Sequence, residues 1–489
     1  MPTRDQNIDG SPASGAPVRT SGSRSAKPPS SGDGVTPWLV LVLVVTLFAG
    51  GLFGYDQGVI SGALRGIKAT FSLSPLLVEV VTSWVTLGAL LGALAGGELA
   101  DRIGRKRAVL IAGAMFTLGA VVQYLAPDAA ILVAGRLIIG AGVGGAAVAA
   151  PLYAAELAPA AVRGRFVSGY QLAITVGIFL AYLVDGALSS YRDWRIMLGA
   201  SAIPGLLLFV VALAAPESPR WLMMMRRRAD AAAVMRKVQP AIDAGPHLDT
   251  IEAALRKDGK RASWGEVFHR EWRRPLMIAI GLAVFQQVTG INAIIYYANQ
   301  IFAAAGFVTE AARMTVTTWA IGGVNVLATL IAIAFIDRLG RRRLLLAGLL
   351  GMGISLVTVG TAFRFIAQAG PAAAAAGPSS AGIVTVLALI AFIICFAFSL
   401  GPVTWTVINE VFPAHIRSRG VAFATAVNWG SAFLVSQGFL SLVGWIGSSS
   451  TFWLFGLLCG IGWVWIYYRV PETKGQTLEQ IQQMWKEKP

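Results

Sequence analysis

The stretch LADRIGRKR, residues 99–107, occurs a second time in the chain as FIDRLGRRR, residues 335–343. Each copy is basic and directly follows a long apolar run. A second pair of related stretches, ELAPAAVRGR at 156–165 and EVFPAHIRSR at 410–419, occupies matching places in the two halves of the chain. The repetition predicts a duplicated fold whose two halves meet around a shared site, as in one large class of membrane proteins.

The apolar runs are long enough to cross a bilayer, which takes roughly 20 residues for a helix. Hydrophobic residues make up 55% of the 489, charged residues 13%, and mean hydropathy is +0.65. We therefore expect an all-α membrane protein with twelve transmembrane helices in two six-helix halves. The runs lie at 38–64, 78–99, 106–125, 129–155, 165–187, 193–215, 275–304, 312–336, 343–367, 382–409, 420–446 and 451–469.

The remaining segments have the composition of tails and a connector. Residues 1–36 are rich in Ser, Pro and Gly and predict a disordered tail. Residues 216–274 predict a linker of short amphipathic helices between the halves 37–215 and 275–470, and 471–489 form a second tail. Most Lys and Arg residues lie in the tails, the linker and alternate loops, which predicts a multi-pass protein of the plasma (inner) membrane with both termini cytoplasmic.

Composition also excludes several functions. The net charge of +15 is spread over loop ends beside apolar helices without interleaved aromatics, so we reject nucleic-acid binding. Both cysteines, Cys395 and Cys459, fall in predicted helices, and no disulfide framework follows. The three histidines fall in loops, so any proton carrier within the membrane is a carboxylate. No metal-ligand spacing or catalytic combination is evident, and we expect neither a cofactor nor an enzyme.

Such a carboxylate occurs in FGYDQGVISG, residues 53–62. An ionised Asp at a helix centre costs roughly 2.5 to 3.5 kcal/mol on insertion scales, so Asp56 needs a function or a partner. The alternative is an acid near the outer helix end that reaches water. Asp56 and Arg136 both lie roughly 10 Å inside the outer boundary and can meet. Desolvation and a neighbouring Arg act oppositely on such a carboxyl, so the pair can be poised to exchange a proton.

Several motifs in order give the chain a specific resemblance. Besides the duplicated basic stretch they are GRLIIGAGVG (135–144), PESPRWL (216–222), QQVTGINAIIYY (286–297), GPVTW (401–405) and PETKG (471–475). Together they resemble the sugar porter family of the major facilitator superfamily from about residue 37 to 480. In proton-coupled members the acid of FGYD accepts the proton and the arginine matching Arg136 is its partner, whereas uncoupled glucose facilitators carry Asn. The resemblance implies proton symport, with facilitated transport as the alternative.

Sugar recognition requires polar groups that pair with hydroxyls and an aromatic face for the ring. Gln286, Gln287 and Asn292 supply amides, but on a regular helix Gln286 and Asn292 would point about 240° apart. We expect Gly290 to provide the break that lets them converge. The resemblance implies further sugar-contacting residues from other helices: Phe53, Gln171, Asn325, Gly401, Trp405, Asn428 and Trp429. For an isolated amide, hydrogen bonding between helices is an equally good explanation.

Ile178 bears on the choice of sugar. It matches glucose-type members of the family, whereas a xylose-type bacterial symporter has Gln at that place. The resemblance therefore favours a hexose such as glucose, and leaves a pentose or myo-inositol open.

Charged residues at the cytoplasmic helix ends predict a latch. Acids contribute little to membrane orientation, so their repeated occurrence beside Arg indicates ion pairs that close the cytoplasmic side. The predicted latch residues are Asp101, Arg102, Arg105, Glu156, Arg163, Asp337, Arg338, Arg341, Glu410 and Arg417. Tyr296 and Tyr297, just past the amides, are candidates for the outer gate.

Two classes of function compete on this scaffold. A transporter moves one monosaccharide, with protons, across the bilayer by alternating access of the halves, and a nutrient sensor binds sugar but signals instead. A sensor is expected to carry a long signalling tail, whereas only about fourteen residues follow PETKG. We predict a transporter, and we expect it to be monomeric.

Overall fold

The computed structural model describes residues 36–188, 193–240, 242–257, 264–375 and 377–474. Residues 1–35 of the predicted disordered tail and most of the C-terminal tail lie outside these residues, whereas Thr36 is described and caps the first helix. Eleven helices of the described residues are long and apolar enough to span a membrane. One of them, Ile416–Arg469, has 54 residues and belongs to α20 (Ala414–Arg469), which contains the predicted eleventh and twelfth helices joined at Gly447. The twelve-helix fold is therefore present, and its last two helices are separated by a kink at Gly447, where φ is 82° and ψ is 160°.

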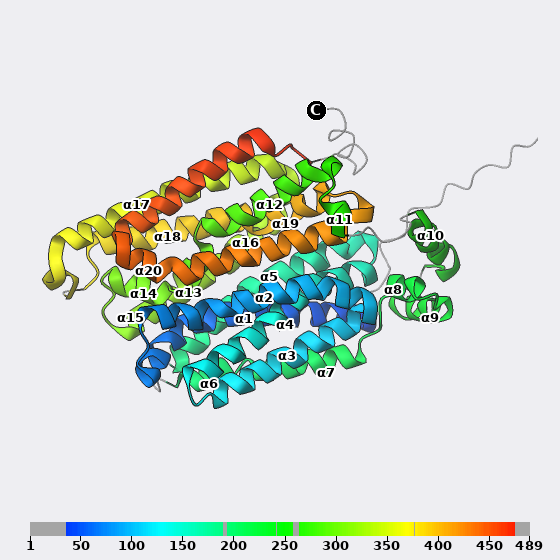
Figure 1. The fold of residues 1–489 in the computed structure, drawn as a ribbon, viewed down its shortest axis with the longest axis horizontal. Helices are drawn as coiled ribbons and strands as arrows, with labels where there is room; N and C mark the ends of the chain where they lie inside the picture. Colours follow the sequence, from blue (N-terminus) through cyan, green and yellow to red (C-terminus); the bar gives the residue numbers. More distant parts are fainter. Residues whose placement is uncertain (1–35, 189–192, 241, 258–263, 376, 475–489) are drawn as a thin grey trace, which may run out of the picture. The chain divides into compact units, whose positions relative to one another are not determined.

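The N-terminal half consists of long helices with clear starting signals. Thr36, Ser74 and Asp128 each cap a helix by accepting a backbone N–H three residues on. The helices are α1 (Pro37–Phe71), α2 (Pro75–Ile103), α3 (Arg105–Leu125), α4 (Ala129–Leu157), α5 (Ala160–Leu188), and the pair α6 (Trp194–Gly199) and α7 (Ala202–Ala214), which replaces the single sixth helix. In Figure 1 these helices run blue through cyan to green along one side of the bundle.

The C-terminal half contains interrupted helices. The predicted seventh helix is divided into α12 (Arg273–Val288), α13 (Ile291–Tyr296) and α14 (Ala298–Ala304), and the eighth into α15 (Glu310–Val316), a π-helical turn η2 (Thr317–Gly323) and α16 (Val324–Leu339). α17 (Arg341–Ala375) follows, and then α18 (Ser380–Phe398) and α19 (Leu400–Val411), which are separated at Ser399. Gly290 has φ 89°, so the expected break is where the amides require it.

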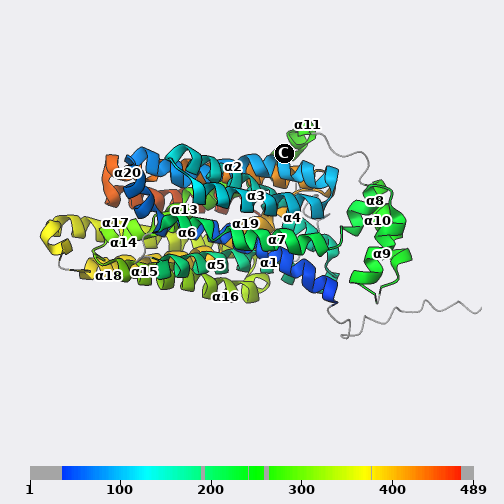
Figure 2. The ribbon, with the colours of Figure 1, turned by 90° about the horizontal axis from the view of Figure 1, so that it is seen from below.

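Short helices connect the halves: α8 (Pro219–Met224), α9 (Arg228–Val238), α10 (Ala244–Lys257), α11 (Trp264–Val267) and the 3-10 turn η1 (Arg270–Trp272). Three hydrogen bonds anchor this linker to the N-terminal half. Thr36 Oγ1 donates to the Val238 carbonyl at 3.0 Å, Trp221 Nε1 to the Asp101 carbonyl at 2.9 Å, and Gln239 Nε2 to the Leu157 carbonyl at 2.8 Å. We call this end of the bundle the linker end, and the opposite end, with α6, α14 and α15, the far end (Figure 2).

The two halves are joined at the far end. α2 packs along α20, and α5 packs against η2 and α16. Glu79 accepts both the backbone N–H and the hydroxyl of Ser441 at 2.6 Å, and one helical turn away Ser83 donates to Gln437 at 2.7 Å. Arg65 pairs with Glu310 at 2.8 Å. These hydrogen bonds and the ion pair join the two halves at the far end.

Candidate functional site

Asp56 and Arg136 form a buried ion pair between α1 and α4. The Arg136 Nη1 atom lies 2.7 Å from Asp56 Oδ1. The Arg136 side chain is 0% exposed and the Asp56 side chain 5% exposed. Arg136 also donates to the carbonyls of Val81 and Thr82 on α2, at 3.1 and 3.2 Å. The guanidinium is therefore fixed by three partners, and the acid is held by one charged group that it can release on protonation.

Four amides of the C-terminal half form a hydrogen-bonded chain. Asn292 Nδ2 donates to Gln287 Oε1 at 2.8 Å, and Gln287 Nε2 donates to Asn428 Oδ1 at 3.1 Å. Asn428 Nδ2 donates to Gln286 Oε1 at 2.7 Å, and Gln286 Nε2 donates to the Leu400 carbonyl at 2.6 Å. The break at Gly290 brings Asn292 back to the amides of α12, as the sequence predicts. The chain offers paired donors and acceptors of the kind that bind vicinal hydroxyls.

Gln57 connects the amide chain to the ion pair. Its Nε2 donates to Asn292 Oδ1 at 3.0 Å, across the two halves. Because Gln57 follows Asp56 directly on α1, the amide chain is one residue away from the acid. Gln57 is not among the residues predicted from the sequence, although its place beside a membrane-embedded acid is a usable signal.

The other predicted sugar-contacting residues fall into two groups. Phe53 meets Trp429 edge to face, with ring centroids 5.1 Å apart, and the Gly401 carbonyl lies 3.3 Å from Gln286 Nε2. For the second group, the described residues show neither a ring contact with Phe53 or Trp429 nor a hydrogen bond to the amide chain. Gln171 is half-buried, Ile178 and Asn325 are buried, and Trp405 is half-buried in α19. Their role in sugar binding stays a prediction.

The predicted gate tyrosines are buried near the far end. Tyr297 donates from its hydroxyl to the Ser436 carbonyl at 3.0 Å and stacks on Phe439 with centroids 5.1 Å apart. Tyr296 is 1% exposed. Tyr182 of α5 donates to the Ile295 carbonyl at 2.9 Å, so the segment that precedes both tyrosines is tied to the other half.

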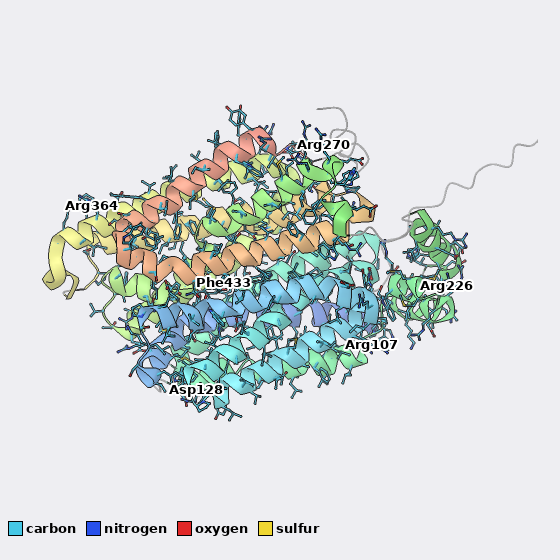
Figure 3. All side chains as sticks on the ribbon, viewed as in Figure 1. Arg107, Asp128, Arg226, Arg270, Arg364 and Phe433 are labelled. Atoms are coloured by element: carbon cyan, nitrogen blue, oxygen red, sulfur yellow. The ribbon has the colours of Figure 1, made fainter. Side chains whose placement is uncertain are left out.

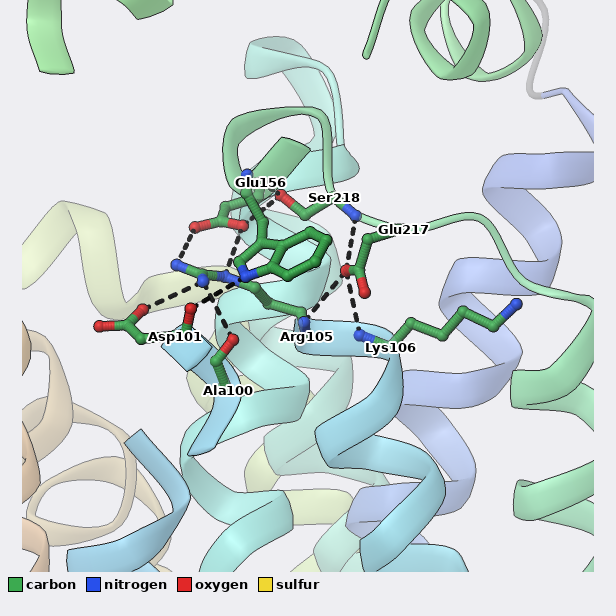
Figure 4. A network of polar contacts seen from close by, with 8 residues as sticks. Ala100, Asp101, Arg105, Lys106, Glu156, Glu217 and Ser218 are labelled. Carbon is green, nitrogen blue, oxygen red and sulfur yellow. Dashed lines mark hydrogen bonds and ion pairs between the residues drawn. The ribbon is translucent and has the colours of Figure 1, made fainter. Parts of the chain in front are cut away.

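At the linker end, Arg105 organises a network of charges in the N-terminal half (Figure 4). Its guanidinium contacts both oxygens of Glu156, at 3.0 and 3.1 Å, and Asp101 at 3.0 Å. Ser218 donates to the same Glu156 carboxylate. Glu217 accepts the backbone N–H groups of Arg105, Lys106 and Ser218 at 3.0, 3.1 and 2.8 Å. Burial raises the pKa of the Glu217 carboxyl, and these amides oppose the shift.

The C-terminal half repeats part of this network. Arg341 Nη2 lies 3.4 Å from Glu410 Oε1, and Glu472 accepts the N–H groups of Arg341 and Arg342. Each acid of the second repeated stretch thus pairs with the arginine of the first stretch in its own half. The side chains of Arg163, Asp337 and Arg338 lie outside the described residues.

Two other predicted latch residues have the following partners. Arg102 pairs with Glu98, one helical turn away, and not with the adjacent Asp101, because residues four apart share a helix face. Arg417 Nε donates to the Phe412 carbonyl, and Glu410 is bound by Arg341. The ion pairs of Glu156 and Glu410 join helices of the same half, so the closing role of the latch stays a prediction.

Two buried acids were missed in the sequence. Glu79 and Asp185 are both 0% exposed. Asp185 on α5 accepts the Gly62 N–H at 2.9 Å, and Gly62 leaves room for it because a Cβ there would lie 2.3 Å from its Cγ. Both acids lie inside or at the edge of predicted membrane spans, and that signal alone was enough to find them.

A duplicated helical bundle with a buried ion pair and an amide chain where its halves meet has the architecture of a secondary transporter. The family model "Sugar (and other) transporter" matches residues 42–485. The galactose-proton symporter of Escherichia coli K12 is 37% identical over 444 residues, covering 90% of this chain and 93% of its own. The arabinose-proton symporter of Bacillus subtilis is 33% identical over 456 residues, covering 92% and 95%.

A solved structure has the same fold. The proton:xylose symporter XylE of E. coli, bound to 6-bromo-6-deoxy-D-glucose, matches with a TM-score of 0.76 and 31% identity over 92% of this chain and 99% of its own. The chain belongs to the sugar porter family of the major facilitator superfamily.

Proposed function

We propose that this protein imports a monosaccharide together with protons by alternating access of its two halves. The observation that carries the proposal is the hydrogen bond from Gln57 to Asn292, because it links the amide chain to the residue next to Asp56. Protonation of Asp56 weakens its attraction to Arg136 and frees α1 to move, and α1 holds the amide chain through Gln57. Sugar binding and proton binding then act on the same helix.

The amide chain supports a sugar as the substrate. Its donors and acceptors already bond to one another, so a ligand must offer both, as adjacent hydroxyls do. The rings of Phe53 and Trp429 next to the site provide the apolar face for a pyranose. The relatives named above are described for galactose, arabinose and xylose, and Ile178 favours a hexose such as glucose in this chain.

The orientation follows from charge. The linker end carries both duplicated basic stretches and the linker, so we place it, with both termini, at the cytoplasmic face of the plasma membrane. The far end, where the halves are joined, then faces outward, and we assign Tyr296 and Tyr297 to the outer gate.

The test is uptake of radiolabelled glucose into proteoliposomes with and without an imposed inward proton gradient. Accumulation above the external concentration, abolished by a protonophore, is the expected result. Uptake that ignores the gradient would identify a facilitator, and binding without uptake would identify a sensor.

A second experiment identifies the substrate. Unlabelled glucose, galactose, xylose, arabinose and myo-inositol compete with labelled glucose in the same vesicles. We expect the two hexoses to compete more strongly than the pentoses. Stronger competition by xylose or myo-inositol would contradict the assignment from Ile178 and leave the transport mechanism intact.

A further inference from the structure

A cavity of about 510 Å³ lies at the linker end between the N-terminal half and the linker helices. Its walls come from the start of α3, the end of α7 and the helices α8 and α9. The anchoring hydrogen bonds of Thr36, Trp221 and Gln239 hold α8 and α9 in place, so the cavity is part of the fold. It is separate from the amide chain and from the ion pair of Asp56.

Cations line this cavity in excess of available acids. Lys106, Arg107, Arg227 and Lys237 face two acids, Glu217 and Asp230. Asp230 is paired with Arg227 at 2.7 Å, and the Oε1 atom of Glu217 accepts three backbone N–H groups. Four cations and two acids leave the side chains of the cavity with an excess of two positive charges.

The contacts of Lys106, Arg107 and Lys237 leave room for an anion. Lys106 Nζ donates to the Leu213 carbonyl at 2.8 Å, and Lys237 Nζ lies 5.3 Å from the Trp38 ring centroid. Arg107 is exposed and lines the cavity, and no ion pair of its side chain is found in the described part of the chain. Figure 3 labels Arg107 at the start of α3, on the side of the linker helices. Several cations around one preformed cavity are a recognition pattern for phosphate groups.

The apolar part of the wall indicates that the phosphate belongs to a lipid. Leu110 and Leu213 line the cavity, and Leu213 is 52% exposed on α7. Its neighbour Val210, also 52% exposed, continues the same apolar surface along a membrane-spanning helix. An anionic headgroup among the cations thus has a continuous path for its acyl chains over α7. We propose that this cavity binds the headgroup of an anionic phospholipid.

The duplicated sequence provides a matched control. Lys106 and Arg107 of the first basic stretch correspond to Arg342 and Arg343 of the second. Arg342 is already engaged: its guanidinium carbon lies 5.1 Å from the Tyr467 ring centroid, and its Nη2 donates to the Tyr467 carbonyl at 2.6 Å. The linker helices α8 and α9 pack on the N-terminal copy, so only that copy is part of the cavity described above.

The experiment is titration of the purified full-length protein in neutral detergent with dioleoylphosphatidylglycerol, followed by native mass spectrometry. Lys106→Gln/Arg107→Gln/Lys237→Gln should weaken binding of the first lipid about tenfold or more, and the single variant Arg107→Gln about fivefold. Arg342→Gln/Arg343→Gln should leave it unchanged. Arg107→Gln removes an exposed side chain, so it reports on the cavity even if the triple variant does not fold.

Two arms identify the source of the phosphate. Dioleoylphosphatidylcholine, which has no net charge, should bind equally well to the wild type and the cavity variants. Glycerol 3-phosphate should not displace phosphatidylglycerol. Equal losses in the cavity and control variants would mean that general surface charge attracts the lipid, and the proposal would fail. It would also fail if glycerol 3-phosphate displaced the lipid, because the site would then belong to a soluble phosphate.

Discussion

The two halves come from one duplicated pattern, yet they are packed in different ways. In the N-terminal half, glycines bring helix backbones together: a Cβ at Gly54 of α1 would lie 1.8 Å from the Ile174 carbonyl oxygen of α5. In the C-terminal half, glycines more often face large side chains, as Gly281 does, where a Cβ would lie 2.2 Å from the Trp465 indole. Backbones in contact cannot yield locally, whereas an indole can turn.

This difference matches a division of roles. The ion pair of Asp56 and Arg136 lies between continuous helices of the N-terminal half, and the amide chain lies on the interrupted helices of the other half. At the interruptions of a helix, a small number of residues can absorb a large change in φ and ψ. We infer that the N-terminal half keeps the proton site rigid and that the C-terminal half adjusts around the sugar.

The largest expected effect separates the two roles. Asp56→Asn mimics an acid that is always protonated, so sugar should still bind and still exchange between equal pools, whereas accumulation driven by a proton gradient should be lost. Uptake into vesicles with and without the gradient measures both. If the variant still concentrates sugar, the proton is carried by another residue, and the division between the halves is wrong.

The packing difference predicts unequal costs for the same small substitution. Gly54→Ala should destabilise the protein by about 3 kcal/mol, because α5 itself must move, and Gly281→Ala by about 1 kcal/mol, because Trp465 is only half-buried and can turn aside. Thermal unfolding in detergent gives both values. Similar losses would show that the two halves are equally deformable.

The sequence was sufficient for features that depend on one helix or on depth in the membrane. The apolar runs predict the helices, the repeats predict the two halves, and equal depth predicts that Asp56 and Arg136 can meet. The break at Gly290 was predictable because Gln286 and Asn292 cannot otherwise converge.

Contacts that depend on how helices are rotated were not predictable from the sequence. Gln57 reaches Asn292 and Glu79 reaches Ser441 only because α1 and α2 turn those faces to the other half. The pairing of Arg105 with Glu156 likewise joins the start of α3 to the end of α4, and the two residues are 51 positions apart. Repeated acids beside arginines indicated ion pairs, but the choice of partner depends on tertiary packing.

Variants of the amide chain should bind the sugar more weakly and still couple its transport to protons. Gln286→Ala or Asn292→Ala leaves neighbouring amides and a sugar hydroxyl unpaired, so binding should weaken by about 1 to 3 kcal/mol. Isothermal calorimetry in detergent measures the affinity. Asn409→Ala is the control, because that exposed amide donates to the Trp405 carbonyl within α19. Unchanged affinity in the first two variants would remove both residues from the site.

The smallest expected effect is a difference in stability between two variants at equivalent acids, Glu156 of the N-terminal half and Glu410 of the C-terminal half. Glu156 is 7% exposed and receives two hydrogen bonds from Arg105 as well as one from Ser218. Glu410 is 25% exposed, has one contact of 3.4 Å with Arg341, and has an unpaired Oε2 among the described residues. Glu156→Gln should therefore cost about 1 to 2 kcal/mol, because a buried guanidinium loses part of its pairing, although Asp101 still compensates its charge. Glu410→Gln should lower the free energy of unfolding by about 0.5 kcal/mol, as expected for a partly exposed ion pair. Thermal unfolding of the two variants decides the comparison, and a larger loss at Glu410 would place the stronger ion pair in the C-terminal half.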